Sequence, residues 1–306
     1  MMALAVDSVS TTWKLAMYKQ RNLKFEFTAE PGILDDKNNT TLVVENCKAQ
    51  AQISMGTNVS GNMADVKIYG LSAELISSLS AKGVGAYNKG SIKIGMNILA
   101  DDEMVFSGGI YACYADMNEM PEVGLVINAM AGLDLMRAST KPFTLKGYAD
   151  YSDIINSICI ANGYTYEGFN VTGGQTNGYY EGSPLEQIRA LCLNARLRFA
   201  VNSRKVTVWP IDLDEKGNID RSKELAAQVS PEHGLIGYPV YSPAGLTIQA
   251  EFSTYIFSGG LIDLTTTLPN ASGRYIANVV THYLSSWIKG GPWYTVCLIT
   301  PLGKRG

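Results

Sequence analysis

The spacing of apolar side chains changes twice along this chain, and that change constrains the fold more than any other feature. Over residues 1–140, apolar and polar side chains alternate, which is the two-residue period of strands with one buried face. A short helix is predicted to interrupt the strands after Ser72, which can cap its first turn. The alternating sets are Leu23, Phe25 and Phe27; Ala49, Ala51, Ile53 and Met55; Ala64, Val66 and Ile68; Ile92, Ile94, Met96 and Ile98; Ile110, Ala112 and Tyr114; and Leu125, Ile127 and Ala129.

Residues 141–229 change to helical spacing. A second helix in this region has a clear start, because Ser183 can cap it, Pro184 suits the first helical position and Glu186 completes a capping box. Two strands that meet at a turn over 202–204 are expected to follow it. The first helical face is predicted to carry Ile154, Ile155, Ile158 and Ala161, and the paired strands Leu197, Phe199, Val201, Val206 and Val208.

Residues 230–306 return to alternation, in the sets Leu246, Ile248 and Ala250; Ile262 and Leu264; Ile276, Asn278 and Val280; and Val296 and Leu298. The chain is therefore predicted to be mainly β with an α+β insertion. We expect two tube-like β-barrel domains, residues 1–140 and 230–306, linked by a small α+β domain, residues 141–229. No repeat in the sequence relates the two predicted barrels.

The charge of the chain argues against nucleic-acid binding. The 306 residues carry a formal net charge of −3, and no basic stripe that could displace counterions from phosphates is present. The last 77 residues hold only four basic and three acidic side chains. A small domain with so few charges is expected to have part of its surface covered by other chains. An uncharged exterior rich in Thr, Ser and Gly is the alternative.

Cysteine, histidine and the chain start give no sign of a metal, a catalytic site or export. Met1–Ser10 lacks the basic and apolar regions of a signal peptide, and no apolar run approaches the about 18 residues of a membrane span. His282 lies in an alternating strand, where a hydrogen-bonded, half-buried imidazole is expected, and His233 has no catalytic partner in sequence. We therefore predict a soluble protein, made in a cytosol, with no cofactor, no metal and reduced, buried thiols at Cys47, Cys113, Cys159, Cys192 and Cys297.

Two acidic segments are candidate sites. Asp101, Asp102 and Glu103 lie between alternating sets and are expected at a hairpin tip, where a solvated turn is the first interpretation. A negative loop lining a DNA passage is the second, because a wall that repels phosphate lets DNA slide. The segment Asp212–Gly217 resembles half of a calcium loop, but Lys216 stands where an oxygen ligand is needed, so a polar loop is predicted there.

Three aromatic residues near the chain end, Trp287, Trp293 and Tyr294, form the last candidate site. They could make a sugar-binding platform, but Trp and Tyr are also enriched at protein interfaces. Because Gly290–Pro292 lies between them, a hairpin that packs on a neighbouring chain is the preferred interpretation.

Several short segments, in order, resemble the baseplate hub proteins of contractile-tailed bacteriophages, a family that includes the hub part of phage late control protein D and of type VI secretion spikes. Ser230–Pro239, Val279–Tyr283 and Trp293–Thr295 are similar to parts of that family's second tube-like barrel. Pro142 to Trp209 resembles its α+β insertion. The first barrel is matched by Val66–Ser72, Gly108–Ile110 and Met130–Asp134.

In that family three copies form a ring, and each copy supplies two similar barrels. The resemblance therefore implies a homotrimeric structural hub, not an enzyme, that adapts the sixfold tail tube to the threefold spike around a DNA channel. It also implies a place in the virion tail baseplate after assembly in the host bacterial cytoplasm. The implied partners are the tail-tube ring, the central spike or needle protein, and baseplate wedge or tape-measure proteins, with DNA only in transit and no membrane insertion.

The residues alone leave three classes of function open. The first is this structural hub of a virion. The second is a carbohydrate-binding or receptor-binding β protein of a tail. The third is a hydrolase with an unrecognised carboxylate pair, for which Asp212 and Asp214 are the candidates.

Overall fold

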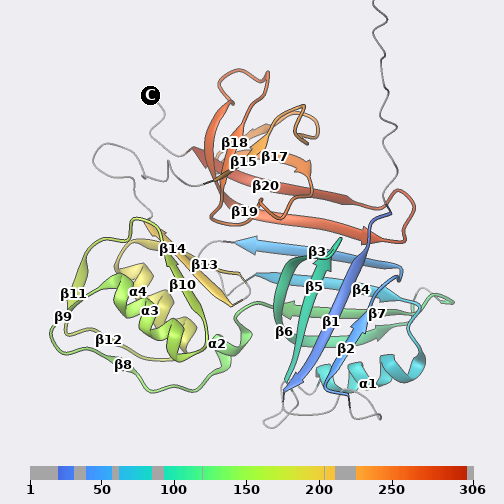
Figure 1. Cartoon of the computed structure of the whole chain (residues 1–306), viewed down its shortest axis with the longest axis horizontal. Coiled ribbons are helices and arrows are strands. Elements are labelled where there is room, and N and C mark those ends of the chain that lie inside the picture. Colours follow the sequence, from blue (N-terminus) through green and yellow to red (C-terminus); the bar gives the residue numbers. More distant parts are fainter. Residues whose placement is uncertain are drawn as a thin grey trace, which may run out of the picture.

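The computed structural model describes residues 20–30, 39–56, 62–84, 93–118, 120–202, 204–210 and 225–301. The fold is mainly β with a segment containing helices in the middle of the chain, as the sequence predicts (Figure 1). The first half comprises β1 (Leu23–Glu30), β2 (Thr41–Val44), β3 (Ala49–Gly56), β4 (Met63–Tyr69), α1 (Ala73–Val84), β5 (Lys93–Ala100), β6 (Glu103–Asp116) and β7 (Gly124–Met130).

The insertion and the second half follow in the chain. The insertion comprises α2 (Leu133–Arg137), β8 (Phe143–Thr144), β9 (Tyr148–Asp150), α3 (Tyr151–Ala161), β10 (Thr165–Gly168), β11 (Gly174–Thr176), β12 (Tyr179–Tyr180), α4 (Pro184–Asn194), β13 (Leu197–Asn202) and β14 (Lys205–Pro210). The second half comprises β15 (Ala226–Val229), β16 (Val240–Ser242), β17 (Gly245–Glu251), β18 (Leu261–Leu264), β19 (Gly273–Ser286) and β20 (Trp293–Pro301).

Most alternating sets of the first half face the core as predicted. Leu23, Phe25 and Phe27 of β1 are fully buried, because the two-residue period places them on one face. The set of β6 is wrong: Ile110 and Cys113 are buried, whereas Tyr114 is 49% exposed. A β-bulge after Ile110 inserts an extra residue and turns Ala112 and Tyr114 to the other face. Ile92 lies outside the described residues.

In β20 the alternation is assigned to the wrong face. The buried residues are Thr295, Cys297 and Ile299, whereas Val296 and Leu298 are half-buried on the opposite face. Both faces of this strand are apolar, so the period of two cannot tell which face meets the core.

The insertion has its own core, with buried residues from α3, α4, β13 and β14. The capping box of α4 is confirmed: Ser183 Oγ accepts the Glu186 N–H, and the Glu186 carboxylate accepts the Ser183 N–H. The predicted hairpin is also confirmed, with Phe199 opposite Val208. Ala161, predicted on the buried face of α3, is exposed at the helix end.

The two halves have the same strand order. In the first half the strands run β3-β4-β7-β6-β5-β1, and in the second they run β16-β17-β20-β19-β18-β15. The fourth strand of each series, β6 or β19, is 14 residues long. Each carries a bulge just beyond the residues that pair with β5 or β18. The bulge follows Ile110 in β6 and Ala277 in β19. Two differences exist: α1 has no helical counterpart in residues 252–260, and β15 runs parallel to β18 whereas β1 is antiparallel to β5.

Strand β19 joins the halves into one sheet of 13 described strands (Figure 1). Its first residues pair with β18, and residues 279–286 pair antiparallel with β3 of the first half. One apolar core therefore spans both halves. The insertion contacts the second half through a separate cluster of Trp209, Ala200, Leu261 and Ile276.

Candidate functional site

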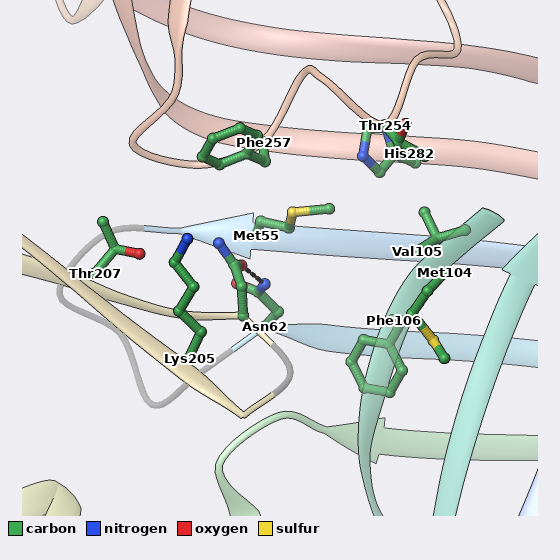
Figure 2. A pocket seen from close by; sticks show the side chains of 11 residues that line it. Met55, Asn62, Met104, Val105, Phe106, Lys205, Thr207, Thr254, Phe257 and His282 are labelled. Atoms are coloured by element: carbon green, nitrogen blue, oxygen red, sulfur yellow. Dashed lines mark hydrogen bonds between the residues drawn. The ribbon is translucent and has the colours of Figure 1, made fainter. Parts of the chain in front are cut away.

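A cavity of about 220 Å³ lies where the two halves and the insertion meet, and Figure 2 shows side chains from all three parts around it. The Asn62 side-chain amide donates a hydrogen bond to Asn202 Oδ1 across the joint between the first half and the insertion. The lining includes Met55 and Phe106 of the first half, Lys205 and Thr207 of the insertion, and Phe257 and His282 of the second half. This mixed lining contains no nucleophile–base–acid arrangement.

His282 is held in this cavity wall as a neutral imidazole. Its side chain is almost fully buried, its Nδ1 lies 2.7 Å from Thr295 Oγ1, and its ring meets the Phe252 ring edge-on at a centroid distance of 5.1 Å. Burial lowers the pKa of His282 to about 4, because the charged form loses its hydration. The predicted hydrogen-bonded histidine is confirmed, and it is more buried than expected. His233 is exposed and lies 2.9 Å from Ser230 Oγ.

The sheet that joins the halves has one face in the core and one face that carries exposed or half-buried side chains. We call the second face of β3, β4, β7 and β19 the open face. Its residues include Gln50, Gln52, Ser54, Asp65, Lys67, Asn128, Thr281 and Tyr283. Amide and hydroxyl groups make up much of this face, which also carries the exposed apolar side chains of Met63 and Val279.

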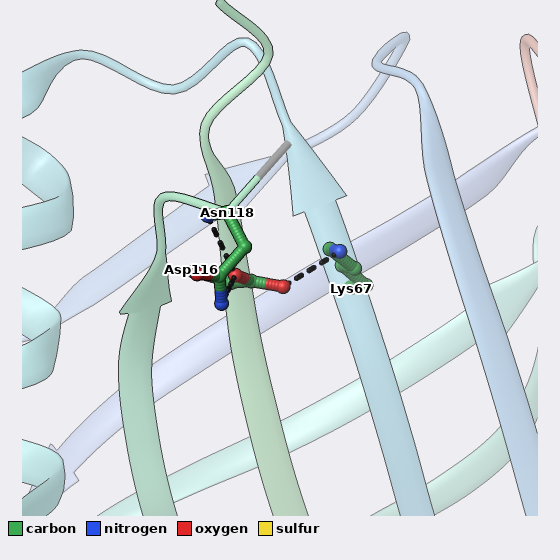
Figure 3. A network of polar contacts seen from close by, with 3 residues as sticks. All are labelled: Lys67, Asp116 and Asn118. Carbon is green, nitrogen blue, oxygen red and sulfur yellow. Dashed lines mark hydrogen bonds and ion pairs between the residues drawn. The ribbon is translucent and has the colours of Figure 1, made fainter. Parts of the chain in front are cut away.

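The positive charge of Lys67 on the open face is matched by a carboxylate. Lys67 Nζ lies 2.9 Å from Asp116 Oδ2, and Asp116 also accepts hydrogen bonds from the Asn118 backbone and side chain (Figure 3). The Lys67 contact holds the pKa of the Asp116 carboxyl below its ordinary value. A Cβ at Gly124 would lie 2.5 Å from Lys67 Cε, so glycine leaves room for the lysine to reach across β7. Asp65 accepts from Asn128 Nδ2.

The acidic hairpin tip lies between β5 and β6, as predicted. Asp101 and Asp102 have φ angles of 49° and 72°, the left-handed pair of a tight hairpin turn. Asp101 Oδ2 accepts from Arg21 Nη1 at 2.9 Å, and Glu103 Oε2 accepts from Thr254 Oγ1 at 2.7 Å. Two of the three carboxylates are therefore engaged within the chain. Their assignment to a channel wall stays a prediction.

The three aromatic residues do not form one cluster. Trp293 faces the core, where it meets Phe252 edge-on at 5.5 Å and has the Arg21 guanidinium 5.2 Å from its ring centroid. Tyr294 points to the opposite face beside Tyr283, since neighbouring residues of a strand alternate. Trp287 is 52% exposed at the β19–β20 turn. Only Trp287 thus offers a largely free ring, which disfavours a sugar platform built from all three.

The remaining predicted features carry no chemistry in the described part of the chain. All five thiols are free; four are buried, and Cys47, predicted to be buried, is only partly so. Burial raises the pKa of Cys113 to about 12. No group of three acidic, histidine or cysteine side chains in the described ranges is placed to hold a metal ion. None of the described helices is both long and apolar enough to cross a bilayer. The Asp212–Glu224 segment, including Asp214, lies outside the described residues.

Comparisons with known proteins identify the fold. The sequence matches no protein-family model, and no curated protein matches it. A tail protein of Neisseria meningitidis MC58 has a similar structure, with a TM-score of 0.61 at 9% identity over 92% of this chain and 96% of that one. The 43 kDa tail protein of prophage MuSo2 from Shewanella oneidensis gives 0.56 at 7% identity, covering 92% of this chain and 99% of that one.

A third similar structure comes from a secretion system. It is the E. coli c3393 protein, described as a component of the type VI secretion system with structural similarity to the T4 bacteriophage tail proteins gp27 and gp5. Its TM-score is 0.55 at 11% identity, covering 85% of this chain and 76% of that one. At these identities the likeness concerns the fold, and the chain has the fold of these phage-tail and secretion-system proteins.

Proposed function

We propose that this protein is a structural hub of a phage tail baseplate, a homotrimeric ring that connects the sixfold tail tube to a threefold spike. The observation that supports this most is the repeated strand order of the two halves within one continuous sheet. Three copies of a chain with two alike lobes present six similar lobes. A ring of three chains can therefore match a sixfold tube on one face and keep threefold symmetry on the other.

The fold of the similar structures supports this role. Tail proteins of two bacterial sources share it, and so does a secretion-system component that is described as similar to two T4 tail proteins. We propose the tube ring, the spike and the neighbouring baseplate proteins as partners, and the virion tail as location. In this role the chain transmits force and has no catalytic step.

The open face is proposed as the wall of the central channel. Its side chains are amides, hydroxyls, the apolar Met63 and Val279, and the carboxylate of Asp65, and its Lys67 is neutralised by Asp116. Such a surface gives phosphates no fixed positive partner, so DNA can pass without being held. The hairpin tip at Asp101–Glu103 is proposed to add negative charge near the channel.

The mass and shape of the purified protein test the ring. The chain has a mass of 33.2 kDa, and we expect a particle of three copies by mass photometry, seen by negative-stain electron microscopy as a ring with a central hole. Adding the neighbouring tube protein is expected to stack rings on one face only. A monomer that stays monomeric in the presence of both neighbouring proteins would contradict the proposal.

Positive charge on the open face is expected to slow DNA passage. In phage that carry Gln50→Lys and Gln52→Lys together, the exposed ammonium groups would bind phosphates, and DNA ejection should slow by at least about tenfold at low salt, with recovery as salt rises. The measurement is the rate of DNA release from purified particles. The matched control is Thr172→Lys with Thr176→Lys, two exposed positions of the insertion. Equal rates for both pairs would place the channel elsewhere.

A further inference from the structure

Two strand edges in the described part of the chain lack the neighbour that their counterparts in the other half have. Residues 279–286 of β19 pair with β20 on one edge and with β3 on the other. The counterpart of β19 is β6, whose residues 112–116 pair with β7 on one edge and with no described strand on the other. The counterpart of β3 is β16, which among the described strands pairs only with β17.

The bulges align β6 with β19 residue by residue. The bulge follows Ile110 in β6 and Ala277 in β19, so Ala115 takes the position of His282 and Tyr114 takes that of Thr281. Equivalent residues of the two strands therefore face the same side. Cys113 is buried like Val280, and Tyr114 points outward.

The hairpin registers align β16 with β3. Ile53 pairs with Ala64, and Tyr241 pairs with Leu246. Ala64 and Leu246 are equivalent, because they pair with Ala129 and Ile299 at the bulges. Tyr241 therefore takes the position of Ile53, and Ser242 takes that of Ser54.

We propose that residues 112–116 of β6 in one copy pair antiparallel with β16 of a second copy, with Ala115 opposite Tyr241 and Tyr114 opposite Ser242. This repeats between chains the junction that His282 and Ile53 make within the chain. The inference rests on the proposed ring and names the surfaces that build it. Because each copy supplies one edge of each kind, the contact is head-to-tail and generates a ring when the rotation closes.

The exposure of the two edges fits this partner. Tyr241 is 47% exposed, whereas Ile53 at the equivalent position is fully buried. Val240 and Tyr114 are 63% and 49% exposed. Apolar side chains beside an unpaired strand edge favour association, and pairing with a second copy covers them as β19 covers β3.

In the single chain, the two residues of each proposed pair face the same side of the sheet. Ala115 and Tyr241 are on the core side, where Tyr241 Oη donates to Pro269 O at 2.8 Å, and Tyr114 and Ser242 are on the open side. Helix α1 packs on the core side of the first half through Ile76 and Leu79 and leaves the outward side chain of Tyr114 exposed.

The ends of β16 restrict the pairing to one short register. Pro239 and Pro243 flank the strand, and neither has a backbone N–H to donate. Prolines at an edge prevent extended pairing with foreign strands. The edge therefore suits a brief, specific contact with a second copy.

Engineered cysteines test the proposed contact in the full chain. Opposite residues of antiparallel strands have Cα atoms about 4.5–5.5 Å apart, within the range that a disulfide spans. We expect Tyr114→Cys with Ser242→Cys, in a Cys47→Ser background, to cross-link most chains into a closed covalent trimer under mild oxidation, seen on a non-reducing gel. The matched control, Ser54→Cys with Thr281→Cys, is the equivalent pair within one chain and should form an intrachain disulfide that leaves the chain monomeric on the gel.

Two further arms make the result decisive. Each single variant alone should give no cross-link, and an equal mixture of the two should give covalent dimers, because the contact is head-to-tail. Tyr114→Cys with Val43→Cys, which joins β6 to the edge strand β2, should not cross-link. A ring seen in the microscope without the 114–242 cross-link would overturn this pairing and leave the hub proposal standing. A chain that stays monomeric at every concentration and with its neighbouring proteins would overturn both.

Discussion

Replacing Trp209 with alanine is expected to lower the free energy of unfolding by about 3–5 kcal/mol, because a fully buried indole leaves a cavity that the surroundings only partly fill. Trp209 lies on β14 of the insertion and packs against Leu261 and Ile276 of the second half. Its ring also fills the space above Gly259, where a Cβ would lie 2.6 Å from the indole. The substitution therefore weakens the contact between the insertion and the second half.

The measurement is chemical denaturation followed by far-UV circular dichroism, together with calorimetry. Because the insertion has its own core, we expect its transition to persist while the transition of the β halves moves to lower denaturant and separates from it. Trp287→Ala is the matched control, since that side chain is 52% exposed and its removal should change stability by less than about 0.5 kcal/mol. Equal effects of the two substitutions would show that Trp209 does not couple the two parts.

Local patterns were sufficient to predict most elements of this chain. The alternation of Leu23, Phe25 and Phe27 predicted a buried strand face, and Ser183 with Glu186 predicted the start of α4. Both signals depend on neighbours within a few residues, so they can be recognised without knowledge of any tertiary contact.

The features that sequence reasoning missed depend on contacts between distant segments. The bulge after Ile110 turns Tyr114 outward, and no residue of β6 predicts this bulge from the sequence. The residues alone did not show the repeated strand order of the halves, because the two series share topology without sharing residues; only the family resemblance implied two similar barrels. The order follows from the strand pairings within each half, and the pairing of β19 with β3 that joins the halves brings together strands more than 200 residues apart.

The candidate sites were found in part. The turn at Asp101–Asp102 was predicted from three polar residues between apolar runs, but its bond to Arg21 and the contact of Glu103 with Thr254 were not, since those partners come from other strands and loops. Grouping Trp293 with Tyr294 overlooked strand alternation, which sends neighbouring side chains to opposite faces. The open face had no sequence signal at all, because Gln, Ser and Thr on a strand are typical of any solvent-facing side.

Acid is expected to destabilise the folded protein through His282. The pKa of this side chain is about 4 in the folded chain, against an ordinary value of 6.5. Between these two pH values the unfolded chain binds a proton that the folded chain excludes, so the free energy of unfolding falls as the pH drops from about 6.5 to about 4. The fall amounts to about 3 kcal/mol and levels off below pH 4, where the imidazole is charged in both states.

His282→Gln is expected to remove this part of the pH dependence, because glutamine can keep a hydrogen bond to Thr295 and does not titrate. The measurement is urea denaturation at a series of pH values from 7 to 4 for both proteins. His233→Gln is the control; its imidazole is exposed, and its replacement should leave the difference between pH 7 and pH 4 unchanged. Lys67 and Arg274 hold the pKa values of Asp116 and Asp263 below the ordinary range, so these carboxylates protonate at lower pH and affect all three proteins alike. A pH profile of His282→Gln that overlays the unaltered protein would mean that the buried imidazole accepts a proton without disturbing the joint between the halves.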